Sequence, residues 1–172
     1  AMTAELRNRC SHRYDCHDSW RRLIHMADHS LVTPALWNEI VSRKWNVLLP
    51  ETVCRYVNAL HTLNLQRNKH LMQQACEVIG SLNAVGIRPL LFKGAGQLFK
   101  PLHPDMGCRI MSDLDILIPA DRIAGALEAI YSIGYFTKKV AYDTSRLHHG
   151  APLVRYGARG SVELHRQVLH ER

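Results

Sequence analysis

The sequence predicts an α+β fold, in which a small mixed sheet is flanked by helices and preceded by an N-terminal helical region. Apolar residues recur at helical spacing through most of residues 18–85. From about residue 87, short apolar runs alternate with glycine-containing turns and helical segments in the order β-α-β-α-β-β. We therefore expect a helical region over residues 2–86 and an α/β core over residues 87–172.

Composition and charge limit the class of protein. The 172 residues are 47% hydrophobic and 22% charged, and a chain of this length buries roughly two-thirds of its unfolded surface. No apolar run approaches the ~20 residues of a membrane span, so we expect no membrane partner. The 5 scattered cysteines favour free thiols and a cytoplasmic location. The net charge of +7 is compatible with a polyanionic partner, a nucleotide phosphate site or a basic surface. Because no dense Lys/Arg run appears, we expect no stable DNA binding.

Three helices are predicted in the first half of the chain. The first covers about residues 18–29. Thr33 and Pro34 begin the second, with Thr33 as its N-cap and Pro34 at its first position. Pro50 begins a long third helix, which Gly86 ends. Single histidines along these helices have polar neighbours, and we assign no chemistry to them: His25, His29, His61 and His70.

The predicted strand over residues 113–118 carries two carboxylates. Successive strand residues alternate between the two faces of a sheet, so Asp113 and Asp115 point the same way. The opposite face is apolar and points into a core through Leu114, Ile116 and Ile118. Neighbouring ionised carboxylates repel each other unless a cation lies between them. An oxygen-only ligand set favours Mg²⁺ or Mn²⁺ over zinc.

Further strands are predicted on both sides of this one. An apolar strand over residues 90–93 runs into a glycine turn and a short helix. A helix over residues 120–133 and a strand over residues 135–142 follow the acidic strand. A hairpin then ends in a strand over residues 161–165, where Val162 and Leu164 face the core. Glu163 therefore lies on the opposite face.

The second half of the chain resembles the nucleotidyltransferase superfamily that includes DNA polymerase β. In particular, it is similar to a bacterial family of uncharacterised nucleotidyltransferases. The resemblance covers about residues 80–170 and implies a nucleotidyltransferase fold. The residues that carry it are Leu91-Phe92-Lys93-Gly94-Ala95, Arg109-Ile110-Met111-Ser112-Asp113-Leu114-Asp115-Ile116-Leu117-Ile118, His148-His149 and Val162-Glu163-Leu164-His165.

The resemblance implies transfer of a nucleoside monophosphate from an NTP to an acceptor hydroxyl of unknown identity, with release of pyrophosphate. Two divalent cations, Mg²⁺ or Mn²⁺, would bind the catalytic carboxylates Asp113, Asp115 and Glu163. The implied nucleotide-binding residues are Lys93, Gly94, Ala95, Arg109 and Ser112. Two metal ions ~4 Å apart would stabilise both the attacking and the leaving oxygen.

The chain departs from the superfamily pattern at the glycine turn. The wider superfamily has Gly-Ser there, whereas Ala95 follows Gly94 in this sequence. The resemblance therefore implies a phosphate site that lacks a serine hydroxyl and in which Lys93 would supply positive charge instead. Because family members continue further, we also expect that a C-terminal substrate-binding region is absent from this sequence.

Several alternatives stay open at this point. Lys93 and Arg109 can pair with the aspartates, and the acidic residues can form solvated strand faces. The three later histidines can serve as a base, contact substrate or lie on the surface: His148, His149 and His165. A catalytically silent nucleotide- or partner-binding module and a toxin-like RNA-directed transferase are the alternative functions.

Overall fold

The computed structural model describes residues 15–103, 105–138 and 150–167 and has the predicted α+β architecture. The chain divides into two compact units. The first consists of residues 1–66 and 103–110, and the second of residues 67–102 and 111–172. The division into two domains at residue 86 stays a prediction. Among the described residues, no helix combines the length and apolar character that crossing a bilayer requires.

The first unit is helical. It contains α2 (Asp15–His29), α3 (Thr33–Ser42), the 3-10 helix η1 (Trp45–Val47) and the beginning of α4 (Glu51–Ala84). Three buried side chains form its core: Ile40, Leu49 and Val57. Partly buried tryptophans pack against them.

The predicted N-cap of α3 is wrong. Val32 occupies the cap position, and Thr33 is already the first residue of the helix. The hydroxyl of Thr33 donates a hydrogen bond to the Asp28 carboxylate. At a helix N-terminus, Ser and Thr hydroxyls commonly accept hydrogen bonds from backbone N–H groups, which is why the sequence predicts Thr33 as the cap. In the structure the Thr33 hydroxyl bonds to Asp28 instead.

Helix α4 has the limits that the sequence predicts. It begins at Glu51, directly after Pro50, and ends at Ala84. Gly86 follows with φ +73°, a left-handed conformation that glycine adopts without a Cβ penalty. The N–H of Gly86 donates to the carbonyl of Asn83 at 3.0 Å, and that of Ile87 to the carbonyl of Leu82 at 2.9 Å.

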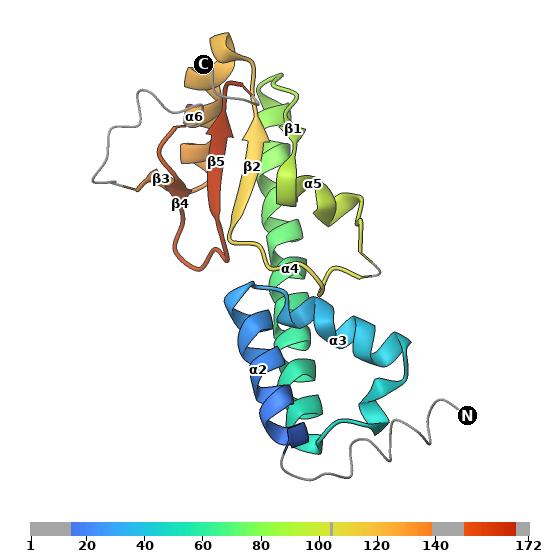
Figure 1. Ribbon diagram of the computed structural model, residues 1–172. Helices are drawn as coiled ribbons and strands as arrows, with labels where there is room; N and C mark the ends of the chain where they lie inside the picture. Colours follow the sequence, from blue (N-terminus) through green and yellow to red (C-terminus); the bar gives the residue numbers. More distant parts are fainter. Residues whose placement is uncertain (1–14, 104, 139–149, 168–172) are drawn as a thin grey trace. The chain divides into compact units, whose positions relative to one another are not determined.

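The second unit contains a five-stranded mixed sheet in the order β1-β2-β5-β4-β3 (Figure 1). Strands β2 and β5 are parallel, and the other neighbouring pairs are antiparallel. Part of the expected strand over residues 135–142 lies outside the described residues. The elements are β1 (Leu90–Leu91), α5 (Lys93–Phe99), β2 (Asp113–Leu117), η2 (Ala120–Arg122), α6 (Ile123–Ser132), β3 (Phe136–Thr137), β4 (Leu153–Val154) and β5 (Ser161–His165).

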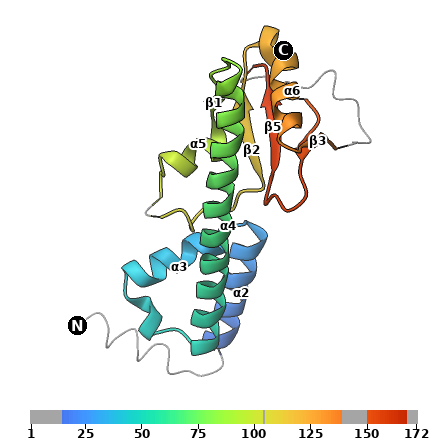
Figure 2. The same ribbon diagram turned by 180° about the vertical axis from the view of Figure 1, so that it is seen from behind.

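The two central strands have one apolar and one polar face. Leu114 pairs with Val162 and Asp115 with Glu163 in the parallel register. The predicted core face is confirmed, because its residues are all buried: Leu114, Ile116, Ile118, Val162 and Leu164. Figure 2 shows the C-terminal part of α4 in front of this sheet. By strand alternation, the other face carries Asp115, Glu163 and His165.

Gln74 of α4 fixes the start of β5. Its side-chain amide donates to the carbonyl of Gly160 at 2.7 Å. Its side-chain oxygen accepts from the backbone N–H of Arg159 at 3.1 Å and of Gly160 at 3.3 Å. A Cβ on Gly160 would lie 2.7 Å from both Leu71 and the carbonyl oxygen of Ser112. Gln74 therefore holds the beginning of the strand that carries Glu163, and the absence of a Cβ on Gly160 allows this backbone to lie close to Leu71 and Ser112.

Gln74→Ala is expected to destabilise the fold by about 1–3 kcal/mol, because it leaves backbone groups near the start of β5 without their buried partner. Urea denaturation followed by circular dichroism measures this change. Gln73→Ala is the matched control, since Gln73 is its exposed neighbour on α4. Equal unfolding midpoints for the two variants would contradict the role assigned to Gln74.

Candidate functional site

A buried carboxylate lies at the centre of the polar face. Asp115 is only 4% exposed. Its Oδ1 accepts a hydrogen bond from the Lys93 ammonium at 2.8 Å and lies 2.8 Å from the His165 Nε2. Because a buried charge is costly unless it is paired and hydrogen-bonded, these two contacts explain how the protein tolerates Asp115 in this position.

The parallel register brings a second carboxylate beside it. Glu163 is the direct neighbour of Asp115 across the β2–β5 pair. The Glu163 Oε2 lies 3.9 Å from the His165 Nε2. One ligand atom from each of Asp115, Glu163 and His165 lies within 4.8 Å of the others. Two carboxylates from separate strands therefore meet at one place.

His165 is the residue whose role the sequence left undecided. The structure buries it completely, at 0% exposure, so it is not a surface histidine. Its ring packs edge-on against Phe92, with centroids 4.8 Å apart and an interplanar angle of 86°. Because an ionised carboxylate only accepts hydrogen bonds, the contact with Asp115 requires a proton on Nε2. The signal that finds this residue is alternation, since Glu163 and His165 share a face.

Asp113 lies at the beginning of β2, where it pairs with Ser161 in the strand register. It is half-buried, and the Ser112 hydroxyl donates to its Oδ1 at 3.3 Å. Among the described residues, Asp113 does not belong to the close group formed by Asp115, Glu163 and His165. By strand alternation, however, it shares their face of the sheet.

The expected phosphate-binding residues fall in two places. Lys93 begins α5 with φ +51°, an uncommon left-handed conformation for a non-glycine residue. Its pairing with Asp115 is one of the alternatives that the sequence left open. Gly94 and Ala95 follow it and are buried.

Arg109 belongs to the first unit, where its carbonyl accepts a hydrogen bond from the Asn64 side chain at 2.8 Å. His148 and His149 lie outside the described residues.

A pocket of about 460 Å³ lies elsewhere in the second unit. Ile123 and Leu127 of α6 line it, together with Leu153 and Leu164 of the sheet. Leu164 belongs to the apolar face, so this pocket opens on the side of the sheet opposite the carboxylates. Of the described residues that line it, none is a candidate site residue.

Comparison with protein families identifies the chain. A family model described as uncharacterised nucleotidyltransferase matches residues 17–172. The match spans nearly the whole sequence, so the chain belongs to this family. Comparison with curated proteins and with solved structures gives no match.

Proposed function

From its membership of the uncharacterised nucleotidyltransferase family, we propose that the chain moves a nucleoside monophosphate from an NTP to an acceptor hydroxyl, with release of pyrophosphate. One observation carries this proposal: Asp115 and Glu163 are direct neighbours in the parallel register, and the Lys93 ammonium contacts Asp115. Acidic ligands from two strands and a nearby cation are what a metal-bound triphosphate requires.

The donor set fits a hard divalent cation. Asp113, Asp115 and Glu163 offer carboxylate oxygens on one face, and such ligands suit Mg²⁺ or Mn²⁺. Among the described residues, the side-chain hydrogen bonds of Asp115 go through Oδ1, so we assign Oδ2 to the cation. When bound, the cation would neutralise charge on the phosphate oxygens.

The protein's own residues have distinct roles in this proposal. His165 donates a hydrogen bond from its Nε2–H to Asp115 Oδ1 and holds the carboxylate in one orientation. Lys93 neutralises Asp115 in the free protein and contacts a phosphate oxygen once the nucleotide is bound. Its side chain is 47% exposed, so it can make this exchange without first being freed from a core. One of the carboxylates accepts the proton of the acceptor hydroxyl.

Titration calorimetry tests the proposal directly. We expect at least one of ATP, GTP, CTP and UTP to bind in the presence of Mg²⁺ and to lose affinity when EDTA removes the cation. Slow release of pyrophosphate should then follow incubation with a mixture of hydroxyl acceptors. Failure of every nucleotide to bind would count against both the site and the reaction.

A catalytically silent module is the second candidate. The observation that favours it is the Lys93 ammonium, which lies 2.8 Å from Asp115 Oδ1 and already neutralises the carboxylate. Under this alternative, nucleotide binding depends on metal but no pyrophosphate appears with any acceptor. Measuring pyrophosphate and binding in the same samples separates the two functions.

An RNA-directed transferase is compatible with the net charge of +7. A protein that contacts RNA phosphates releases the counterions bound to the RNA, so its affinity falls steeply as the salt concentration rises. RNA binding measured between low and physiological salt therefore tests this alternative, and no binding at low salt would exclude it.

Lys93→Gln is expected to raise the Kd for the Mg²⁺-NTP complex by about 10- to 100-fold, because a hydrogen bond to a charged group contributes ~1.5–3 kcal/mol. Calorimetry with the nucleotide that binds wild-type protein gives the comparison. Lys100→Gln is the control, since Lys100 is an exposed lysine directly after the same helix. The phosphate role of Lys93 would be wrong if both variants bound as tightly as wild type.

A further inference from the structure

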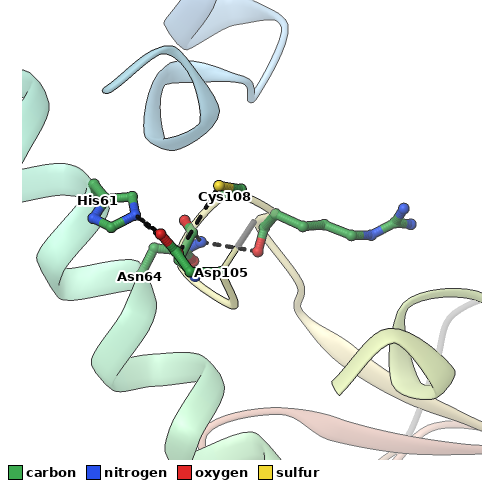
Figure 3. Close-up of polar contacts among 6 residues, drawn as sticks. His61, Asn64, Asp105 and Cys108 are labelled. Atoms are coloured by element: carbon green, nitrogen blue, oxygen red, sulfur yellow. Dashed lines mark hydrogen bonds and ion pairs between the residues drawn. The ribbon is translucent and has the colours of Figure 1, made fainter. Parts of the chain in front are cut away.

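A second cluster of ligating side chains lies in the first unit. His61 of α4 lies beside Asp105 and Cys108 of the segment before β2 (Figure 3). The His61 Nε2 is 3.0 Å and 3.1 Å from the two Asp105 carboxylate oxygens. The Cys108 Sγ is 3.9 Å from Asp105 Oδ1. One ligand atom from each residue lies within 4.8 Å of the others.

The backbone around this cluster is held in place by α4. The side-chain amide of Asn64 donates to the carbonyl oxygens of Gly107 and Arg109, both at 2.8 Å (Figure 3). The N–H of Gly107 donates to Asp105 Oδ1 at 2.6 Å. A Cβ on Gly107 would lie 2.6 Å from the His61 Nε2. Glycine at this position therefore lets the backbone approach the cluster.

We propose that His61, Asp105 and Cys108 bind a borderline divalent transition metal, with zinc as the expected ion. The donors are one imidazole nitrogen, one carboxylate oxygen and one thiolate sulfur, a mixture that suits zinc and not magnesium. Three protein ligands leave the fourth tetrahedral position for water.

The distances between the donors support this assignment. Zinc bonds of 2.0–2.3 Å in tetrahedral geometry separate ligand atoms by about 3.2–3.8 Å. The His61–Asp105 separations of 3.0 and 3.1 Å and the Cys108–Asp105 separation of 3.9 Å bracket that range. The donor atoms of all three residues lie within 4.8 Å of one another. Small side-chain adjustments are therefore enough to admit the ion. It would join α4 to the 105–108 segment within the first unit.

This site differs in chemistry from the one proposed for nucleotide transfer. Cys108 brings a sulfur ligand, whereas the other group offers carboxylates and an imidazole. The inference does not rest on the proposed function. A protein with the double substitution of Asp113 and Asp115 to Ala should keep the zinc site. Metal binding at the zinc site and nucleotide binding at the carboxylates are measured separately, so each proposal can fail without the other.

Cobalt substitution tests the site. Co²⁺ is added to the metal-free, reduced protein of 172 residues, and the near-ultraviolet thiolate-to-cobalt charge-transfer band is recorded. We expect saturation at one equivalent and displacement of the band by Zn²⁺. Cys108→Ser should abolish the band. Cys76→Ser is the control, because Cys76 is an exposed free cysteine of α4 outside the cluster.

Two further variants keep the test decisive if Cys108→Ser folds poorly. His61→Gln should weaken Co²⁺ binding while circular dichroism shows an intact helical protein. Asn64→Ala should weaken it by about 10- to 100-fold, because residues that orient metal ligands have effects of this size. A charge-transfer band that persists in Cys108→Ser would assign the thiolate to another cysteine, such as Cys10 or Cys16, and overturn the proposal. Absence of the band in wild-type protein would also overturn it.

Discussion

Asp115→Asn is expected to lower the rate of nucleotidyl transfer by about 10³-fold or more, because loss of a metal ligand removes several kcal/mol of transition-state stabilisation. The substitution preserves shape and keeps an oxygen that can accept from Lys93 and His165. The free energy of unfolding should therefore stay within about 1 kcal/mol of wild type, as Lys93 can return to solvent. A large loss of activity with an intact fold is the expected combination.

Pyrophosphate release under single-turnover conditions, with the nucleotide selected by calorimetry, measures the effect of this substitution. Asp121→Asn is the matched control, since Asp121 is an exposed aspartate in η2 of the same unit. Equal rates for the two variants would remove Asp115 from the catalytic machinery. Urea denaturation of both proteins checks that activity and stability change independently.

Ile116→Ala is expected to reduce stability while sparing the site, whereas Asp115→Asn reduces activity and spares stability. The expected loss in the free energy of unfolding is about 2–5 kcal/mol. Ile116 is 0% exposed and lies on the apolar face of β2, directly after Asp115. Removing its side-chain carbons costs their burial and leaves a cavity in a central strand. The midpoint of urea denaturation should fall accordingly.

Leu90→Ala on β1 provides the control for this substitution. Leu90 is exposed, so its truncation should change stability by about 0.5 kcal/mol or less. Nucleotide binding by the folded fraction of Ile116→Ala should remain close to wild type. If both leucine and isoleucine variants unfold alike, the assignment of the core face of β2 would be incorrect.

The sequence was a good guide wherever local pattern decides structure. Period-two alternation predicts the apolar faces of both central strands, because side chains on a strand alternate regardless of what packs on them. Pro50 and Gly86 predict the ends of the long helix through backbone geometry alone. The hairpin that places Glu163 opposite the core is also confirmed, since β4 and β5 pair antiparallel.

Contacts between distant segments could not be obtained in this way. Nothing local in the sequence specifies that Asp115 pairs with Glu163, because register between separate strands depends on the whole sheet. The burial of His165 against Phe92 depends on the same pairing. The cluster around His61 joins a helix to a segment 44 residues later. A single histidine among polar neighbours gives no sign of such a partner.

The parallel pairing of β2 with β5 has a consequence for how the protein is made. Asp115 and His165 are 50 residues apart, whereas Lys93 and Asp115 are 22 apart. A ribosome that adds ~5–20 residues per second needs about 3–10 s to extend the chain from the aspartate to the histidine. Closing the shorter loop also costs less entropy. During translation, the nascent chain is thus expected to form its lysine–aspartate contact first and to complete the acidic group only after β5 emerges.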